Sequence, residues 1–103
     1  MLLSILIVNW NTKDLVLRCV DSVLRTINDL DFEIIVVDNA SQDGSFEALH
    51  DAYAGDARVK FIKAPINLGF ARANNLAFQK SAGKYIFLLN PDTVVKKGAI
   101  DTL

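Results

Sequence analysis

The stretch YIFLLNPDTVV, residues 85–95, runs from five apolar or aromatic residues directly into Asn90, Pro91 and Asp92. Pro91 has no backbone N–H and biases the residue before it away from helix, so a strand made of the apolar run must end there. Asp92 is then expected just outside the carboxyl end of a strand. Because ligands of open α/β sheets bind at that edge, the stretch predicts a strand followed by a polar site.

Strands and helices are predicted to alternate along the rest of the chain. Strand-like runs lie at residues 4–10, 32–38, 58–64 and 84–89. Helical spacing of apolar residues is found between these runs. The three helices are expected from a cap at Asn11 or Thr12 to Ile27, from a cap at Asp43 or Ser45 to Gly55, and from Gly69 or Phe70 to before Gly83. The sequence of residues 96–103 predicts the start of one more helix.

This alternation predicts right-handed βαβ units and a parallel sheet. The run at 58–64 is the least hydrophobic and is expected at an edge, whereas the runs at 4–8 and 85–89 are the most apolar and are expected to be neighbours in the centre. We therefore predict one domain over residues 1–103. Its fold class is α/β, a Rossmann-like open parallel sheet of strand order 3-2-1-4 within three αβα layers.

The composition excludes several classes of protein. Eleven basic and twelve acidic residues leave no basic excess for a dedicated nucleic-acid binder. Cys19 is the single cysteine, so no internal disulfide forms, and its apolar surroundings favour a small core residue over a nucleophile. His50 is also alone and is expected on a helix surface. No run has the length of a membrane helix or the basic start of a leader. We expect a cytoplasmic chain, with membrane association open for a longer protein.

Polar residues follow three of the predicted strands. They are Asn9-Trp10-Asn11, Asp38-Asn39 and Asn90-Pro91-Asp92, and Asn67, Gly69 and Arg72 open the third predicted helix nearby. A helix N-terminus there suits phosphate. Asn and Asp are also common turn residues, and Asp43 and Ser45 are better explained as caps. Asp38 and Asp92 together, beside Arg72, favour a ligand site.

A dinucleotide-binding domain is the nearest general alternative, with Asp38 as the acid that ends its second strand. Such a domain needs a glycine-rich turn after the first strand so that the pyrophosphate can approach the backbone. Residues 9–15 here read NWNTKDL and contain no glycine. The dinucleotide interpretation fails at this turn, and no phosphate-binding P-loop motif is present either.

Four segments in order, VNWN, VVDNASQDGS, NLGFARANN and FLLNPDT, resemble the nucleotide-binding half of family 2 glycosyltransferases with the GT-A fold. They are most similar to the rhamnosyltransferase-like branch. The resemblance implies that Asn9 and Asn11 border the nucleotide and that Asp38, followed by Asn39, contacts the base or ribose. It further implies that Asn67, Gly69 and Arg72 line the base and diphosphate.

The resemblance also implies a divalent metal, Mg²⁺ or Mn²⁺, at Asp92. The family motif D-x-D is here Asn90-Pro91-Asp92, which leaves Asp92 as the only motif carboxylate, so tight metal binding is not expected without the nucleotide. Mg²⁺ is usually held by one or two carboxylates together with substrate phosphates. Asn90 is placed with the nucleotide-binding residues.

The implied reaction is the inverting transfer of a sugar from a nucleoside-diphosphate sugar to a hydroxyl of a glycan or lipid-linked acceptor in surface polysaccharide synthesis. dTDP-rhamnose or a UDP-sugar is favoured as the donor. The family's catalytic base usually lies well downstream of the metal motif, so no catalytic residue is assigned and the chain is expected to be an inactive fragment of a longer enzyme. A non-catalytic binding module of the same fold is the alternative. Apolar residues Val94, Val95, Ile100 and Leu103 predict pairing of the chain with a second copy.

Overall fold

A computed structural model describes residues 1–27 and 29–96 of the chain. The elements are β1 (Leu3–Asn9), α1 (Lys13–Thr26), β2 (Phe32–Asp38), α2 (Ser45–Tyr53), β3 (Val59–Lys63), α3 (Phe70–Lys80) and β4 (Tyr85–Leu88). Each lies within two residues of its predicted position. The helix expected from Lys96 falls on residues 97–103, outside the described part, as do Ile100 and Leu103.

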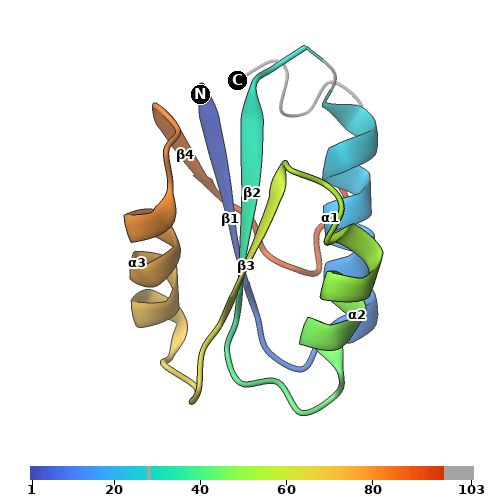
Figure 1. The fold of residues 1–103 in the computed structure, drawn as a ribbon, viewed down its shortest axis with the longest axis vertical. Helices are drawn as coiled ribbons and strands as arrows, with labels where there is room; N and C mark the ends of the chain where they lie inside the picture. Colours follow the sequence, from blue (N-terminus) through green and yellow to red (C-terminus); the bar gives the residue numbers. More distant parts are fainter. Residues whose placement is uncertain (28, 97–103) are drawn as a thin grey trace.

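The described strands form a parallel sheet of order β3-β2-β1-β4, which confirms the predicted topology (Figure 1). β1 pairs with β2 from Leu3 opposite Phe32 to Asn9 opposite Asp38. β4 pairs only with the first part of β1, from Tyr85 opposite Leu3 to Leu88 opposite Leu6. The carboxyl ends of the strands therefore share one edge, which the sequence predicted for the site.

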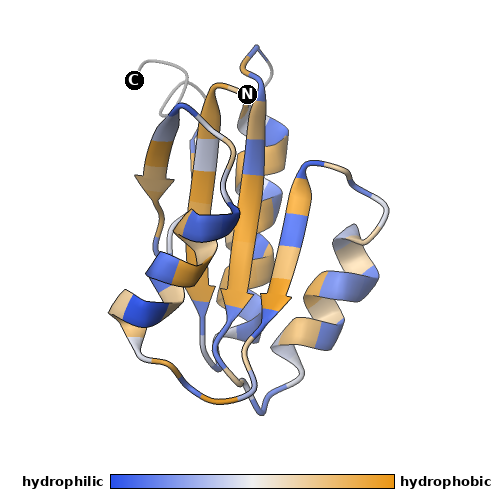
Figure 2. Ribbon diagram, turned by 60° about the vertical axis from the view of Figure 1, so that its left-hand side comes forward, coloured by the Kyte–Doolittle hydropathy of each residue, from blue (hydrophilic) through white to orange (hydrophobic). Residues whose placement is uncertain are grey.

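Helices cover both faces of the sheet, as the predicted three-layer arrangement requires. α1 and α2 lie on one face and α3 on the other (Figure 1). The larger core, on the α1 side, includes Ile5, Ile7, Ile34 and Val36, and the smaller core, on the α3 side, includes Leu6, Ile35 and Val37. β1 and β2 are mostly hydrophobic along their length (Figure 2) and contribute apolar residues to both cores, as expected for strands covered on both faces. Among the described helices, none is long and apolar enough to cross a membrane.

The expected position of β4 needs a correction. β4 is the neighbour of β1, as predicted, but β1 and β2 form the centre and β4 lies at an edge of the described sheet. α3 packs against β1 and β2, and the side chains of Tyr85 and Leu88 remain 58% and 55% exposed. Within the described residues the apolar composition of β4 therefore corresponds to partial burial only at Phe87, which packs against the larger core. β3 forms the opposite edge, as its lower hydrophobicity predicted.

Candidate functional site at the carboxyl ends of the strands

Asn9 and Asp38 form a buried polar pair where β1 and β2 end. Asn9 Nδ2 donates to Asp38 Oδ1 at 2.9 Å, and the backbone N–H of Ser41 donates to Asp38 Oδ2 at 3.1 Å. The Thr12 hydroxyl donates to Asn9 Oδ1 at 2.6 Å. Asp38 is 1% exposed and both of its oxygens have a donor. In this structure its carboxylate therefore supports the two loops that follow the strands.

Asn11 links the same two loops further out. Its backbone N–H donates to Ser41 Oγ at 2.9 Å, and its Oδ1 accepts the N–H of Gln42 at 2.7 Å. Asn11 has φ 52°, a left-handed conformation that asparagine tolerates better than most residues. Ser41 was not identified from the sequence. The only signal for it was its position three residues after Asp38, where an acidic side chain often accepts a backbone N–H.

Asp43 caps two helices at once. Its Oδ2 accepts the N–H of Lys13, the first residue of α1, at 3.0 Å, and its Oδ1 accepts the N–H of Ser45, the first residue of α2, at 3.0 Å. Partial burial alone would raise the pKa of Asp43, but bonds from the Ser45 hydroxyl and these N–H groups lower it on balance. Asp43 thus has the predicted capping role. Ser45 begins α2 instead of capping it, and Thr12 stands at the cap position of α1 with its hydroxyl turned to Asn9.

Asn39 holds the loop that leads into α3. Its Oδ1 accepts the N–H of Leu68 at 2.7 Å, and its Nδ2 lies 3.5 Å from the carbonyl oxygen of Gly69. The N–H of Gly69 donates to Asn67 Oδ1 at 2.8 Å. Gly69 has φ +79° and ψ 165°, a combination open essentially to glycine alone. These contacts fix the side of the site formed by residues 67–69.

A pocket of about 270 Å³ lies between these loops and the end of β4. Its lining residues are Val8, Trp10, Thr12, Asn39, Asn67, Phe70 and Pro91. Trp10 and Phe70 are 53% and 61% exposed, although large aromatic side chains are mostly buried in stable domains. Neither had been assigned a role from the sequence, where Trp10 was noted only as part of the NWN turn. The pocket combines two aromatic side chains with the amides of Asn39 and Asn67.

The turn Asn90–Asp92 lies against α1. Cys19 Sγ is 3.6 Å from the carbonyl oxygen of Asn90, and the N–H of Thr93 closes the turn on the same oxygen at 3.0 Å. Burial, and secondarily the negative charge of Asp92, raises the pKa of the Cys19 thiol to about 12. Cys19 is therefore a protonated core residue, as expected. Asp92 itself is exposed, and its neighbour Pro91 lines the pocket.

Arg72 lies apart from this pocket. It is exposed on α3 and lines a separate hollow of about 290 Å³ with Leu68, Asn75, Leu76 and Gln79. Within residues 1–27 and 29–96 no ion pair of Arg72 is found. β1 also separates the ends of β2 and β4. Asp38, Asp92 and Arg72 therefore do not meet as one cluster, although the two hollows adjoin at Asn67 and Leu68.

The sequence model of the glycosyl transferase family 2 matches residues 4–103 of the chain. The match covers nearly the whole sequence, including every strand end that lines the pocket. The chain belongs to glycosyltransferase family 2. This agrees with the resemblance drawn from the four sequence segments, whereas nothing in the match singles out the rhamnosyltransferase-like branch.

The chain is similar to parts of longer known proteins. Chondroitin synthase of Escherichia coli is 36% identical over 101 residues, which are 97% of this chain and 14% of that protein. S. aureus TarS, residues 1–349, in complex with UDP-GlcNAc superimposes with a TM-score of 0.86 at 20% identity, over 99% of this chain and 30% of that one. The mannosyltransferase PcManGT of Pyrobaculum calidifontis, in complex with GDP-Man and Mn²⁺, gives a TM-score of 0.84 at 22% identity, over 97% and 29%.

These likenesses confirm the GT-A-like fold. The chain spans only 10% to 39% of the lengths of the curated relatives that it matches.

Proposed function

We propose that the chain is the donor-binding region of a glycosyltransferase and that it binds a nucleoside-diphosphate sugar at the carboxyl ends of its strands. The observation that carries this proposal is the pocket between Trp10 and Phe70, which lies where open α/β sheets bind ligands. Its size and its mixture of aromatic and amide groups suit a flat heteroaromatic base. The nucleotide-sugar complexes of the two similar structures support the same choice.

The nucleobase of the ligand is proposed to occupy the pocket with its ring against Trp10 or Phe70. Stacking of a base on an aromatic side chain contributes about 1–3 kcal/mol. Asn67 is exposed at the pocket wall, whereas Asn39 is buried and its amide bonds Leu68 and Gly69, so the loop that forms this wall is already fixed by its own hydrogen bonds. A pocket fixed in advance loses less conformational entropy when the ligand binds. In this arrangement Asn9, Asn11 and Asp38 act as the support behind the pocket.

The diphosphate is proposed to extend from the pocket toward Asn90 and Asp92, since Pro91 lines the pocket and Asp92 is exposed beside it. The described residues contain no group of three or more His, Cys, Asp or Glu side chains that could hold a metal by themselves. One carboxylate with phosphate oxygens and water is nevertheless a usual arrangement for Mg²⁺. The residues therefore fit Mg²⁺ or Mn²⁺ bound together with the nucleotide, held by Asp92 with Asn90 nearby.

Such an ion supplies positive charge to the nucleoside diphosphate as it leaves. The proposed reaction is inverting: an acceptor hydroxyl oxygen attacks the anomeric carbon, the bond from that carbon to the diphosphate oxygen breaks, and a base takes the hydroxyl proton. Among the donors, dTDP-rhamnose or a UDP-sugar is favoured by the resemblance to the rhamnosyltransferase-like branch. A growing surface glycan or a lipid-linked sugar is the proposed acceptor.

We assign no described residue as the catalytic base that takes the proton of the acceptor hydroxyl. Asp14, Glu47 and Asp51 are exposed on helices, and Asp43 caps two of them. Asp38 is buried with both oxygens bonded. We propose that the catalytic base and the acceptor site belong to other parts of a longer protein. The competing interpretation is that the chain is a non-catalytic module of the same fold.

Calorimetric titration of the 103-residue chain with UDP, dTDP and GDP, each with and without Mg²⁺ or Mn²⁺, tests the proposed function. Binding of at least one of them with micromolar to millimolar affinity, and competition by its nucleotide sugar, is the expected result. Absence of binding by all three under both conditions would contradict the proposal. A transfer assay on a longer chain then separates the enzyme from the non-catalytic module, because only the enzyme releases nucleoside diphosphate in the presence of acceptor.

A further inference from the structure

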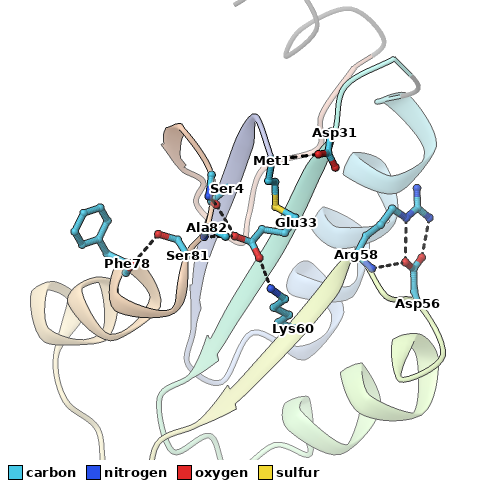
Figure 3. A network of polar contacts seen from close by, with 11 residues as sticks. Met1, Ser4, Asp31, Glu33, Asp56, Arg58, Lys60, Phe78, Ser81 and Ala82 are labelled. Carbon is cyan, nitrogen blue, oxygen red and sulfur yellow. Dashed lines mark hydrogen bonds and ion pairs between the residues drawn. The ribbon is translucent and has the colours of Figure 1, made fainter.

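A buried carboxylate lies at the end of the sheet away from the pocket. Glu33, the second residue of β2, is 1% exposed. Its Oε1 accepts from Lys60 Nζ on β3 at 2.6 Å, and its Oε2 accepts from the Ser4 hydroxyl on β1 at 2.6 Å and from the N–H of Ala82 at 2.7 Å (Figure 3). The N–H of Gly83 donates to Ser4 Oγ at 2.8 Å. Glu33 thus joins three strands to the loop between α3 and β4.

The loop between α3 and β4 approaches β1 so closely that it needs a glycine at position 83. A Cβ atom placed on Gly83 would lie 2.5 Å from both the backbone nitrogen and the hydroxyl oxygen of Ser4. Real Cβ atoms do not come so close to backbone atoms, so only glycine lets the loop reach Ser4 and Glu33. This close approach accompanies the hydrogen bond from the Gly83 N–H to Ser4 Oγ and indicates that the loop is built to meet β1 at this point.

β4, which follows the loop, has little burial to hold it in place. It has four residues and lies at an edge of the described sheet, and Tyr85, Ile86 and Leu88 are exposed while Phe87 is only partly buried against the larger core. The buried face of a strand specifies its register, and in β4 that face is short, because only Phe87 and the following Leu89 pack against the larger core. A slip of one residue would move the chain by about 3.3 Å and turn each side chain to the opposite face. The Asn90–Asp92 turn, which follows directly, would move with it.

We propose that Glu33 is a positioning residue: through Ser4, Ala82 and Gly83 it fixes the register of β4 on β1, and so fixes where the Asn90–Asp92 turn stands at the pocket. The effect on ligand rests on the proposed function, whereas the effect on β4 does not. Lys60 is the cationic side chain that faces Glu33, from β3, and its ion pair balances the buried charge. The carboxylate acts from the end of the sheet opposite the ligand, with no contact to it.

Hydrogen exchange measured residue by residue on Glu33→Gln tests the claim about β4. Glutamine keeps one acceptor oxygen and loses the charge, so it cannot accept from Lys60 and from Ser4 and Ala82 together. The N–H groups of Tyr85 and Leu89, bonded to the carbonyls of Leu2 just before β1 and of Leu6 within it, are expected to exchange at least about tenfold faster. Those of Asn39 and Ala64, which join β1–β2 and β2–β3, should stay within about threefold.

Two further variants keep the result interpretable. Ser4→Ala leaves the Glu33–Lys60 pair and removes the acceptor of the Gly83 N–H, so it should reproduce the β4 effect if Glu33→Gln does not fold. Leu49 is a fully buried residue of α2, so Leu49→Ala is the matched control for general destabilisation. It should accelerate the hydrogen exchange of the amides of all strands together. A Glu33→Gln pattern like that of Leu49→Ala would overturn the proposal.

The second readout is nucleoside-diphosphate affinity with and without Mg²⁺. Glu33→Gln is expected to lose most of the gain in affinity that the metal produces, while the metal-free affinity changes less than about threefold, since the base pocket is built mainly on β1, β2 and the loop before α3. An unchanged metal gain would overturn the positioning role. If the wild type binds no nucleotide, the proposed function fails, and hydrogen exchange alone decides whether Glu33 fixes β4.

Discussion

The Asn9 amide and the Asp38 carboxylate face each other in register at the ends of β1 and β2, with 2.9 Å between Nδ2 and Oδ1. A carboxylate buried this deeply is tolerated only when donors satisfy it, and Asn9 and the Ser41 N–H do so. The pair therefore determines the course of two loops that border the pocket. Asp38 supports the site in this structure through that arrangement.

Asp38→Asn is expected to destabilise the fold and to weaken nucleoside binding. The asparagine offers one acceptor oxygen, so either Asn9 or the Ser41 N–H loses its partner, and a buried unpaired donor costs about 1–3 kcal/mol. Urea unfolding and calorimetry measure the two effects. Asp51→Asn, at an exposed position on α2, is the control and should change neither. A stable Asp38→Asn protein with wild-type nucleoside affinity would rule out the support role.

Trp10→Ala is expected to weaken nucleoside binding by about 1–3 kcal/mol, because it removes a stacking surface of the pocket. The thermal midpoint should change little, since the side chain is about half exposed and packs little apolar area. Phe78→Ala is a suitable control, because Phe78 is an exposed aromatic residue near the C-terminal end of α3 and lies outside the pocket lining. Equal losses in the two variants would show that the aromatic pocket does not hold the base.

The stability of the chain should fall in acid partly because of Glu33. Burial alone would raise the pKa of Glu33, but hydrogen bonds from Lys60, Ser4 and the Ala82 N–H, together with the Lys60 charge, lower it below its ordinary value of 4.5. A carboxyl whose pKa is lower in the folded state stabilises the fold above its unfolded pKa and loses that contribution as pH falls through the folded pKa.

Below about pH 4.5 the free energy of unfolding of the wild type should therefore decrease more steeply than that of Glu33→Gln. Denaturant unfolding between pH 7 and pH 3 measures both curves. Asp43 and Asp56 also have lowered pKa values and contribute to the slope in both proteins, so the difference between the curves isolates Glu33. Parallel curves would show that the Glu33 carboxylate carries no net stabilisation.

The 103-residue chain alone is expected to transfer no sugar at a useful rate. General-base assistance contributes about 10²–10⁴-fold and acceptor positioning adds to it, and the described residues that line the pocket include no carboxylate. Incubation with candidate sugar nucleotides and acceptors, followed by mass spectrometry of the products, measures this. Transfer equal to that of a longer chain would place the base within these residues.

Most of the fold followed from local patterns. The bounds of β2, residues 32–38, were predicted without error, because the apolar run 34–37 is continuous and ends in the Asp38-Asn39 turn. The position of β4 was harder to predict, since an apolar run indicates a tendency to be buried and not which elements cover it. Within the described residues only Phe87 of β4 packs against a core, and Tyr85, Ile86 and Leu88 remain exposed.

The sequence predicted where the site residues lie along the sheet edge better than it predicted which of them contact one another. Residue types at strand ends indicated which side chains share an edge, but the hydrogen bonds that tie Asp38 to Asn9 and Ser41 depend on the course of two loops. Trp10 and Phe70 were missed because exposed aromatic residues have no signature in apolar periodicity. Glu33 was missed because a single acidic residue at the start of a strand resembles a solvent-facing one until its partners from β1, β3 and the loop before β4 are known.

The metal dependence of nucleoside-diphosphate binding in Asp92→Ala tests the central claim most directly. Calorimetry of wild type and Asp92→Ala, each with and without Mg²⁺ or Mn²⁺, gives four affinities for one nucleotide. The wild type should bind more tightly with metal, whereas Asp92→Ala should lose most of that gain and keep its metal-free affinity, because Asp92 is exposed and outside the base pocket. The same gain with metal in both proteins would contradict a metal-assisted donor site at the end of β4.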